Sequence, residues 1–360
     1  MIHNIALVGG GNISETHARA AVETRETRLV AVWGDNQRKA ASLAARHGAT
    51  CHETLDECLA HRPLDVVLIG SPSGLHTEHA GAAARRGLHV LVEKPLDIST
   101  ARIDALIADC ERAGVKLGVF YQDRTAPDIQ WLRNVVTSGA LGRMIVVAAR
   151  VRWFRTREYY SESRWRGTWA LDGGGALMNQ GSHTVDLLLW LLGEPTRVFA
   201  RTCTAVHDLE VEAPAVACIE FASGALATIE VTTAAYPGFP RRIELTGSEG
   251  TVILEGDRIV SADLRGSAVE LPAGAGGNDA SPGERAVSAT VSDVRGHRAI
   301  LEDFLHAIET GGRPLCDGAE ARRSVALIES IYHSARNGEA IVLDSGQSLV
   351  LDVDRDRTKT

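Results

Sequence analysis

Short apolar strands alternate with helices through the N-terminal third of the chain, and this alternation constrains the fold more than any other feature. Apolar runs at 4–8, 29–33, 65–69, 89–92 and 116–120 are separated by segments with helical periodicity. The strands are apolar on both faces, as in a parallel sheet covered by helices. Since parallel strands are joined by right-handed connections, the pattern predicts a doubly wound α/β domain.

The pattern changes after residue 121, where period-two strand signals replace the strand–helix repeat. Ile219 and Phe221 precede an Ala-Ser-Gly turn, and Ile229 and Val231 follow it with the same alternation. We therefore expect a largely antiparallel sheet over 143–254. We also expect an inserted helix at 176–192, a surface loop at 273–283, and two closing helices at 297–310 and 318–337.

A chain of 360 residues is too long for one ordinary core. We predict an N-terminal Rossmann domain over residues 1–122. A second α/β domain with a large, mostly antiparallel open sheet then covers 123–360 and binds substrate and further copies of the chain.

The charge and cysteine content narrow the class of protein. A net charge of -8 without a basic patch argues against a nucleic-acid or membrane-surface partner. The six cysteines form no CxxC pair, which favours a reducing compartment without disulfides or a zinc site. The start of the chain does not read as a secretory signal, and no apolar run has the length of a membrane span, so we expect a cytoplasmic protein.

A glycine turn ends the first strand. Gly9 permits a tight turn and Gly11 permits close approach of a pyrophosphate, while Asn12 and Ile13 begin a helix whose free N–H groups face the phosphates. Ser14 stands where the third glycine of the motif would be. The position after the first strand favours dinucleotide binding over a turn without a ligand.

The end of the second strand carries the residues that distinguish NAD from NADP. Asp35 is placed to bind a ribose 2′-hydroxyl, which favours NAD. Arg38 or Lys39 could instead receive the 2′-phosphate of NADP, and Asp35 could simply cap a helix. The sequence slightly favours NAD and leaves both cofactors open.

Glu93-Lys94-Pro95 ends a buried strand at the sheet edge where doubly wound folds bind ligands. Burial would lower the pKa of Lys94 and suit it to proton exchange with a hydroxyl group. The alternative is a structural or surface lysine.

Asn179, His183 and Asp186 have the spacing of one helix face in an otherwise Leu-rich segment. Buried polar groups need partners, so this face is either part of a site or a hydrogen-bonded core. No acid–histidine set has recognisable ligand spacing, and we expect no metal.

Aromatic and arginine side chains are interleaved between Trp153 and Trp169, and Tyr159, Trp165 and Arg166 are candidate substrate contacts. Such groups fit a sugar that carries a carboxylate or phosphate, or alternatively a structural rim or subunit contact. Gln122 and Arg124, and Asp186 on the helix face, are further candidates for the same pocket.

In these motifs, taken in order, the chain resembles the Gfo/Idh/MocA oxidoreductases, named for glucose–fructose oxidoreductase and inositol dehydrogenase. The segments that carry the resemblance are the glycine turn, Ser71–His76, Glu93-Lys94-Pro95, and Gly173–Asp186.

The resemblance implies hydride transfer between NAD or NADP and a carbon-bound hydroxyl. It places Ser71, Pro72 and His76 near the cofactor and Glu93 near its ribose, and it makes Lys94 and His183 catalytic. Many members carry Asp where this chain has Asn179, and an amide cannot take a proton. An acid–histidine relay through residue 179 is therefore in doubt.

We predict an NAD(P)-dependent oxidoreductase acting on a secondary hydroxyl or ketone of a sugar, sugar acid or cyclitol, assembled as a homodimer or homotetramer. One alternative is a non-catalytic NAD(H)-binding regulator or scaffold. The other is a lyase or glycosidase-like enzyme that oxidises its substrate transiently and retains NAD.

Overall fold

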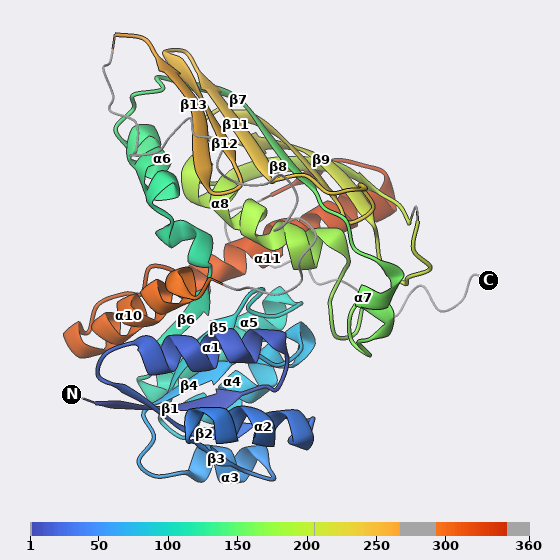
Figure 1. The fold of residues 1–360 in the computed structure, drawn as a ribbon. Coiled ribbons are helices and arrows are strands. Elements are labelled where there is room, and N and C mark those ends of the chain that lie inside the picture. Colours follow the sequence, from blue (N-terminus) through green and yellow to red (C-terminus); the bar gives the residue numbers. More distant parts are fainter. Residues whose placement is uncertain (1, 205, 267–292, 344–360) are drawn as a thin grey trace.

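The first domain is built on a parallel sheet with the strand order β3-β2-β1-β4-β5-β6. A computed structural model describes residues 2–204, 206–266 and 293–343, and the loop expected at 273–283 lies outside them (Figure 1). The order reverses between β1 and β4, which creates a crevice at the carboxyl ends of the strands. The strands are β1 (His3–Val8), β2 (Thr27–Trp33), β3 (Thr50–Cys51), β4 (Val66–Ile69), β5 (His89–Glu93) and β6 (Leu117–Phe120).

Helices cover this sheet and confirm the predicted doubly wound fold. Strands β1, β4, β5 and β6 are almost wholly buried, as their apolar composition on both faces requires, while β2 and β3 are partly exposed. Gly48 and Gly114 end two of the helices in the left-handed conformation. The helices are α1 (Asn12–Glu23), α2 (Gln37–His47), α3 (Leu55–Ala60), α4 (His76–Ala84) and α5 (Thr100–Ala113), with short 3₁₀ turns η1 (Ser73–Leu75) and η2 (Gln122–Thr125).

The second domain is an eight-stranded sheet with the order β13-β12-β11-β7-β10-β9-β8-β14. Every pairing is antiparallel except that of β10 with β7, as the period-two pattern predicted. The sheet extends beyond 143–254, because β13 and β14 follow that range. Its strands are β7 (Met144–Arg152), β8 (Pro195–Thr202), β9 (Pro214–Phe221), β10 (Leu226–Thr232), β11 (Arg242–Gly247), β12 (Gly250–Glu255), β13 (Arg258–Leu264) and β14 (Ile341–Val342).

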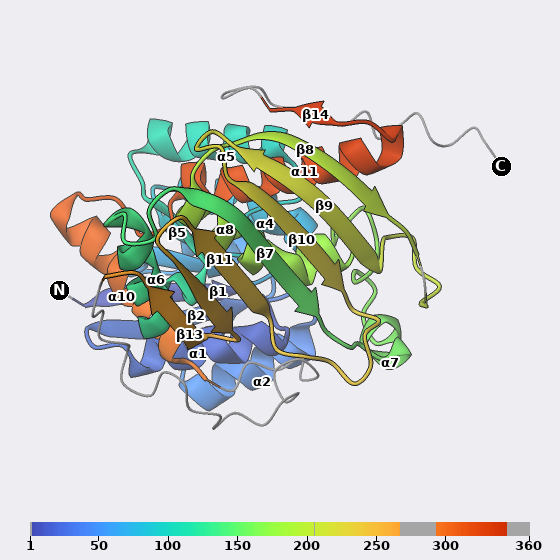
Figure 2. The same ribbon diagram turned by 90° about the horizontal axis from the view of Figure 1, so that it is seen from above.

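Within the described residues, helices cover one face of this sheet. The buried residues of β9 and β10 face α6 (Pro127–Thr137), α8 (Ser182–Leu192) and α11 (Gly318–Asn337). The alternate residues are exposed, and Figure 2 looks onto this open face. The short helix α7 (Arg157–Ser161) follows β7 and lies beside the sheet toward the first domain (Figure 1).

The C-terminal helices return to the first domain. Helix α10 (Arg295–Thr310) packs against α1, and its Phe304 joins the core that surrounds Phe120. The phenyl ring fills the space beside Gly118, where a Cβ would lie 2.6 Å from it. The division at residue 122 therefore remains a proposal about folding units, because the core of the first domain also uses residues from the end of the chain.

Within residues 2–204, 206–266 and 293–343, every helix is too short or too polar to traverse a lipid bilayer.

Candidate active site

Lys94 lies at the carboxyl end of β5, directly above the crevice of the first sheet. Its Nζ donates a hydrogen bond of 2.9 Å to the backbone oxygen of Asn179, which belongs to the second domain. Burial lowers the pKa of Lys94, while Glu93, Asp172 and Asp123 act in the opposite direction. The residue therefore joins the two domains and is poised to exchange hydrogen bonds with a ligand.

Asn179 lies in a π-helical turn, η3 (Leu177–Gly181), that precedes α8. Its Nδ2 donates a 2.8 Å hydrogen bond to Oδ1 of Asp172, whose Oδ2 accepts from the backbone N–H of Gly167 at 2.9 Å. Burial raises the pKa of Asp172 to about 7. The carboxylate that Asn179 lacks is thus supplied by Asp172, which the sequence analysis missed although it directly precedes the three glycines.

His183 is the second residue of α8, and its side chain is largely buried. Its Nδ1 lies 3.9 Å from Oδ2 of Asp123 and makes no hydrogen bond within the described part of the chain. Burial lowers the pKa of His183 to about 4, against the influence of Asp123. The imidazole is therefore neutral at neutral pH, with a carboxylate nearby that would stabilise its protonated form.

Asp123 is held by Arg241, which the sequence analysis also missed. The Arg241 guanidinium bonds to Asp123 and, at 2.9 Å, to Asp257. Burial opposes ionisation of Asp123, but Arg241 and then His183 keep the pKa of that carboxyl below its usual value. No periodic pattern in the sequence marks Arg241, because its partners come from distant segments.

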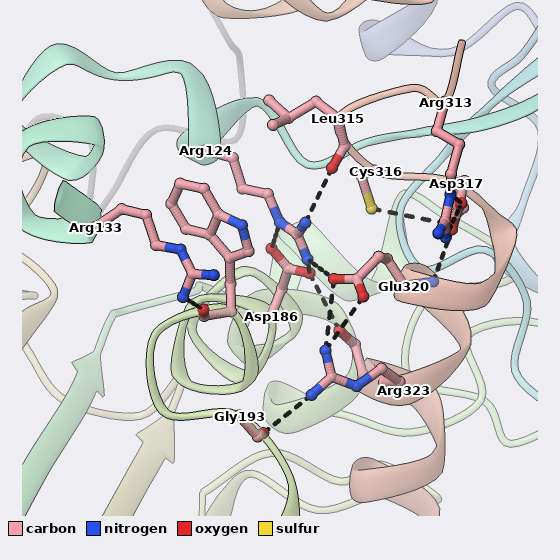
Figure 3. Close-up of polar contacts among 12 residues, drawn as sticks. Arg124, Arg133, Asp186, Gly193, Arg313, Leu315, Cys316, Asp317, Glu320 and Arg323 are labelled. Carbon is pink, nitrogen blue, oxygen red and sulfur yellow. Dashed lines mark hydrogen bonds and ion pairs between the residues drawn. The ribbon is translucent and has the colours of Figure 1, made fainter. Parts of the chain in front are cut away.

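The prediction that Arg124 and Asp186 contact substrate is not supported by their positions. They form a bidentate ion pair, with Nε and Nη2 of Arg124 at 2.8 and 2.7 Å from the Asp186 carboxylate (Figure 3). Both side chains are 1% exposed. Asp186 is therefore occupied by Arg124, and the π-helical turn at 177–181 separates Asn179 from the regular helix that carries His183 and Asp186.

The surroundings of this pair are built from further arginine and acidic side chains (Figure 3). Arg323 donates to the backbone oxygen of Gly193 at 3.0 Å and lies 2.9 Å from Glu194, while Arg313 pairs with Asp317. Arg133 lies over the Trp190 ring. These contacts link α6, α8 and α11 behind the site.

Glu93, which the resemblance places near the ribose, makes buried contacts with two histidines. Its carboxylate is buried between His17 of α1, at 2.9 Å from Nε2, and His297 of α10, at 3.4 Å from Nε2. Although burial opposes ionisation, these histidines hold the pKa of Glu93 well below its usual value. The other carboxylate oxygen accepts the backbone N–H of Lys94 at 3.0 Å, so the cluster also positions Lys94. The three side chains have metal-ligand chemistry, which the sequence spacing did not reveal.

The glycine turn fits a dinucleotide. Gly9 has a φ of 141°, and a Cβ there would lie 2.6 Å from the backbone oxygen of Gly70. Gly11 is exposed at the N-terminus of α1, and a Cβ there would meet no atom within 4 Å. The first-turn N–H groups of Asn12 and Ile13 follow it, so the cradle is open where a pyrophosphate would approach.

The segment after β4 borders this cradle. His76 is buried, and its two ring nitrogens lie 2.8 Å from the backbone oxygens of Pro95 and Ser71. Pro72 precedes η1 between them. His76 therefore joins the Ser71 loop to the Lys94 loop, and its place near the cofactor stays a prediction.

The aromatic rim lies beside the Asn179 turn. Tyr159 Oη accepts a hydrogen bond of 3.2 Å from Gln180, and the Arg166 guanidinium lies 4.1 Å from the Tyr159 ring centroid. Trp165 also faces Arg166. Gln122 begins η2, next to Asp123, and its Oε1 is buried without a partner among the described residues.

A matched pair of glycine substitutions tests the cradle. Gly11→Ala is expected to leave the thermal midpoint within about 2 °C, because the site has room for a methyl group, but to weaken NADH binding at least about ten-fold by filling the pyrophosphate approach. Gly9→Ala is expected to lower the midpoint as well, because of its clash with Gly70. Fluorescence titration with NADH and thermal melts measure both. Unchanged NADH affinity in Gly11→Ala would contradict the assignment.

The fold is that of an α/β dinucleotide-binding oxidoreductase, in which Lys94 of the first domain bonds to the second domain and acts on the charge of His183. Residues 3–121 match the oxidoreductase family with an NAD-binding Rossmann fold, and residues 129–253 match the GFO/IDH/MocA C-terminal domain. The chain belongs to the Gfo/Idh/MocA family, and it is an NAD(P)-dependent oxidoreductase.

Three dehydrogenases are similar to this protein over nearly its whole chain. D-xylose 1-dehydrogenase (NADP(+)) 2 of Haloferax volcanii is 31% identical over 94% of this chain and 99% of its own. Inositol 2-dehydrogenase of Rhizobium meliloti is 26% identical over 93% of this chain and 97% of the dehydrogenase. The WlbA dehydrogenase of Bordetella pertussis was solved with NADH and UDP-GlcNAcA and is 32% identical to this chain, with a TM-score of 0.85. The match covers 96% of this chain and 98% of the WlbA chain.

Proposed function

We propose that this enzyme transfers a hydride between nicotinamide and a secondary hydroxyl or ketone of a sugar, sugar acid or cyclitol, with Lys94 and His183 at the reacting carbon. The observation that carries the proposal is the hydrogen bond from Lys94 Nζ to the turn that precedes the His183 helix. It ties the ammonium to the turn that leads into the His183 helix, and the charge of Lys94 acts on His183.

In the oxidation direction, His183 accepts the hydroxyl proton while the C–H electron pair departs as hydride. The electrons of the broken O–H bond form the carbonyl. The nicotinamide, when bound, supplies the hydride acceptor. Lys94 donates a hydrogen bond to the substrate oxygen, and Asp123 stabilises the imidazolium. Asp172 holds Asn179, whose backbone oxygen accepts the hydrogen bond from Lys94. General-base assistance of this kind is worth about 10²–10⁴-fold in rate.

The rim favours a substrate with an anionic group. The charge of Arg155 lowers the pKa of Lys94, and the charge of Arg166 lowers the pKa of Asp172. Both guanidinium groups are therefore near the proposed site. The arginine fork suits a carboxylate, and the faces of Tyr159 and Trp165 suit a sugar ring. The names of the relatives, which include dehydrogenases of xylose and inositol, support a sugar or cyclitol.

A substrate panel tests the function. The purified protein is mixed with NAD or NADP and with D-xylose, myo-inositol or UDP-GlcNAcA, and the absorbance of reduced nicotinamide is followed. Net reduction with at least one sugar is the expected result. Product formation without net reduction would instead identify the retained-cofactor lyase, and binding of NADH without any turnover would identify the non-catalytic regulator.

The proposed roles give a bell-shaped pH profile of kcat/KM for oxidation. Activity is expected to fall as pH drops through about 4, where His183 becomes protonated and loses its ability to accept a proton. It is expected to fall again on the alkaline side below 10.5, because the pKa of Lys94 is lowered and the neutral amine no longer donates as an ammonium. His183→Asn should lose the acid limb. An unchanged acid limb in that variant would assign it to another group.

We further propose a homodimer or homotetramer in the cytoplasm. The open face of the second sheet carries exposed Phe199, Val216 and Leu226, which favours association with another copy. Cys203 and Cys218 are free and exposed, as a reducing compartment permits. A monomeric mass in light scattering would refute the oligomer, and recovery in the periplasmic or secreted fraction would refute the compartment.

A further inference from the structure

A cavity lies between the two domains at the carboxyl end of β2. It has a volume of about 630 Å³ and is lined by residues Asp35, Asn36, Gln37 and Arg38 of the first domain and by Arg164 of the second. The four residues of the first domain lie at the N-terminus of α2. Arg164 comes from the segment after α7, which approaches the first domain in Figure 1.

The lining of the cavity carries more positive than negative charge. Arg38 and Arg164 are both exposed, and within the described residues neither makes a hydrogen bond or ion pair. The N-terminus of α2 adds the positive end of a helix dipole. Asp35 is the only acidic side chain in the lining, and it is exposed. This combination fits an anion bound between the two guanidinium groups.

The segment that carries Arg164 crosses the carboxyl edge of the first sheet. Near its end, the Leu171 backbone oxygen accepts the N–H of Gly74 at 2.8 Å, beyond β4. A Cβ at Gly74 would lie 2.7 Å from the Ala170 oxygen, so the contact is close. The next residue, Asp172, holds Asn179 beside Lys94. The segment 164–172 thus runs from the end of β2, past β4, to the end of β5.

This path follows the edge along which a dinucleotide lies in a doubly wound fold, with its adenosine ribose at the end of β2. We propose that Arg164 is a cofactor-binding residue supplied by the second domain, and that it forms with Arg38 a site for the 2′-phosphate of NADP(H). The inference rests on the proposed function only in its use of a nicotinamide dinucleotide.

The proposed site changes the expected relative affinity for NAD and NADP. Asp35 alone favours NAD, because a carboxylate repels a 2′-phosphate. Two guanidinium groups outweigh one carboxylate, and the exposed Asp35 has no hydrogen bond or ion pair in the described structure that would prevent it from turning away. The enzyme is therefore expected to bind NADPH as well as NADH, with affinities within about ten-fold of each other.

Direct titration of the full chain with NADPH and with NADH tests this assignment without any sugar. Arg164→Gln and Arg38→Gln are each expected to weaken NADPH binding about ten-fold or more, as loss of a charge-assisted hydrogen bond does, and to change NADH binding less than about three-fold. Arg157→Gln is the matched control, because it removes the same charge from exposed α7 outside the cavity lining. It should change neither affinity.

The outcomes separate this inference from the proposed function. Equal effects of Arg164→Gln on the two dinucleotides, or none on either, would overturn the phosphate site, as would an unsubstituted protein that binds NADH but not NADPH. A protein that binds NADPH through Arg164 and yet oxidises no sugar would support the site while refuting the proposed activity.

Discussion

Replacing Lys94 by methionine is expected to reduce kcat for sugar oxidation by about 10³-fold while leaving the fold intact. The methionine retains the apolar length of the side chain but removes the ammonium that holds the substrate oxygen and balances the charges of Asp123 and Asp172. The Asn179 carbonyl oxygen loses one donor and keeps a contact of 3.3 Å with Ser182 Oγ. The cost in stability should therefore be about 1 kcal/mol.

Lys116→Met is the matched control for this experiment. Lys116 Nζ also donates to backbone oxygens, at 2.9 Å to Gly311 and 2.6 Å to Gly312, but it lies at the amino end of β6 and is exposed to solvent at these contacts. Steady-state kinetics, NADH titration and thermal melts are measured on both variants. If Lys94→Met retained kcat within about ten-fold of the unsubstituted enzyme, Lys94 would not act at the reacting carbon.

The first sheet and its helices were predictable because their signals are local. Apolar strands, helical periodicity and glycine caps lie within short windows of sequence, and the structure confirms the doubly wound order. The hairpin around Ser223 was predictable for the same reason, since Ile219 and Ala227 are register partners. The return of α10 to the first domain was not, because its contact with α1 is distant in sequence.

The partners of the site residues required three-dimensional information. Lys94 and His183 were identified from a motif, but Asp123, Asp172 and Arg241 act on them through contacts between segments far apart in the chain.

The expected face of Asn179, His183 and Asp186 assumed an uninterrupted α-helix, whereas a π-helical turn ends at Gly181. Asp186 lies within the regular helix α8 and pairs with Arg124, and this buried ion pair makes a separate prediction about stability.

Asp186→Asn is expected to lower the free energy of unfolding by about 3 kcal/mol, because it leaves the buried Arg124 guanidinium with only the longer ion pair to the partly exposed Glu320, at 3.3 Å. Ser324 Oγ lies 3.3 Å from Asp186 and cannot replace that charge. The matched control is Glu230→Gln, which breaks the bidentate pair that Glu230 forms with Arg152 at 2.7 and 2.9 Å. That pair is exposed, so its loss should cost about 1 kcal/mol or less.

Urea unfolding of both variants measures the difference, and a double variant identifies its cause. Arg124→Met combined with Asp186→Leu removes both charges and should recover most of the stability lost in Asp186→Asn, since apolar replacement of a buried pair is often neutral or stabilising. Recovery would show that the cost comes from the unpaired guanidinium. If Asp186→Asn cost no more than Glu230→Gln, Glu320 alone would balance the charge of Arg124, and the pair with Asp186 would not be the contact that stabilises the fold.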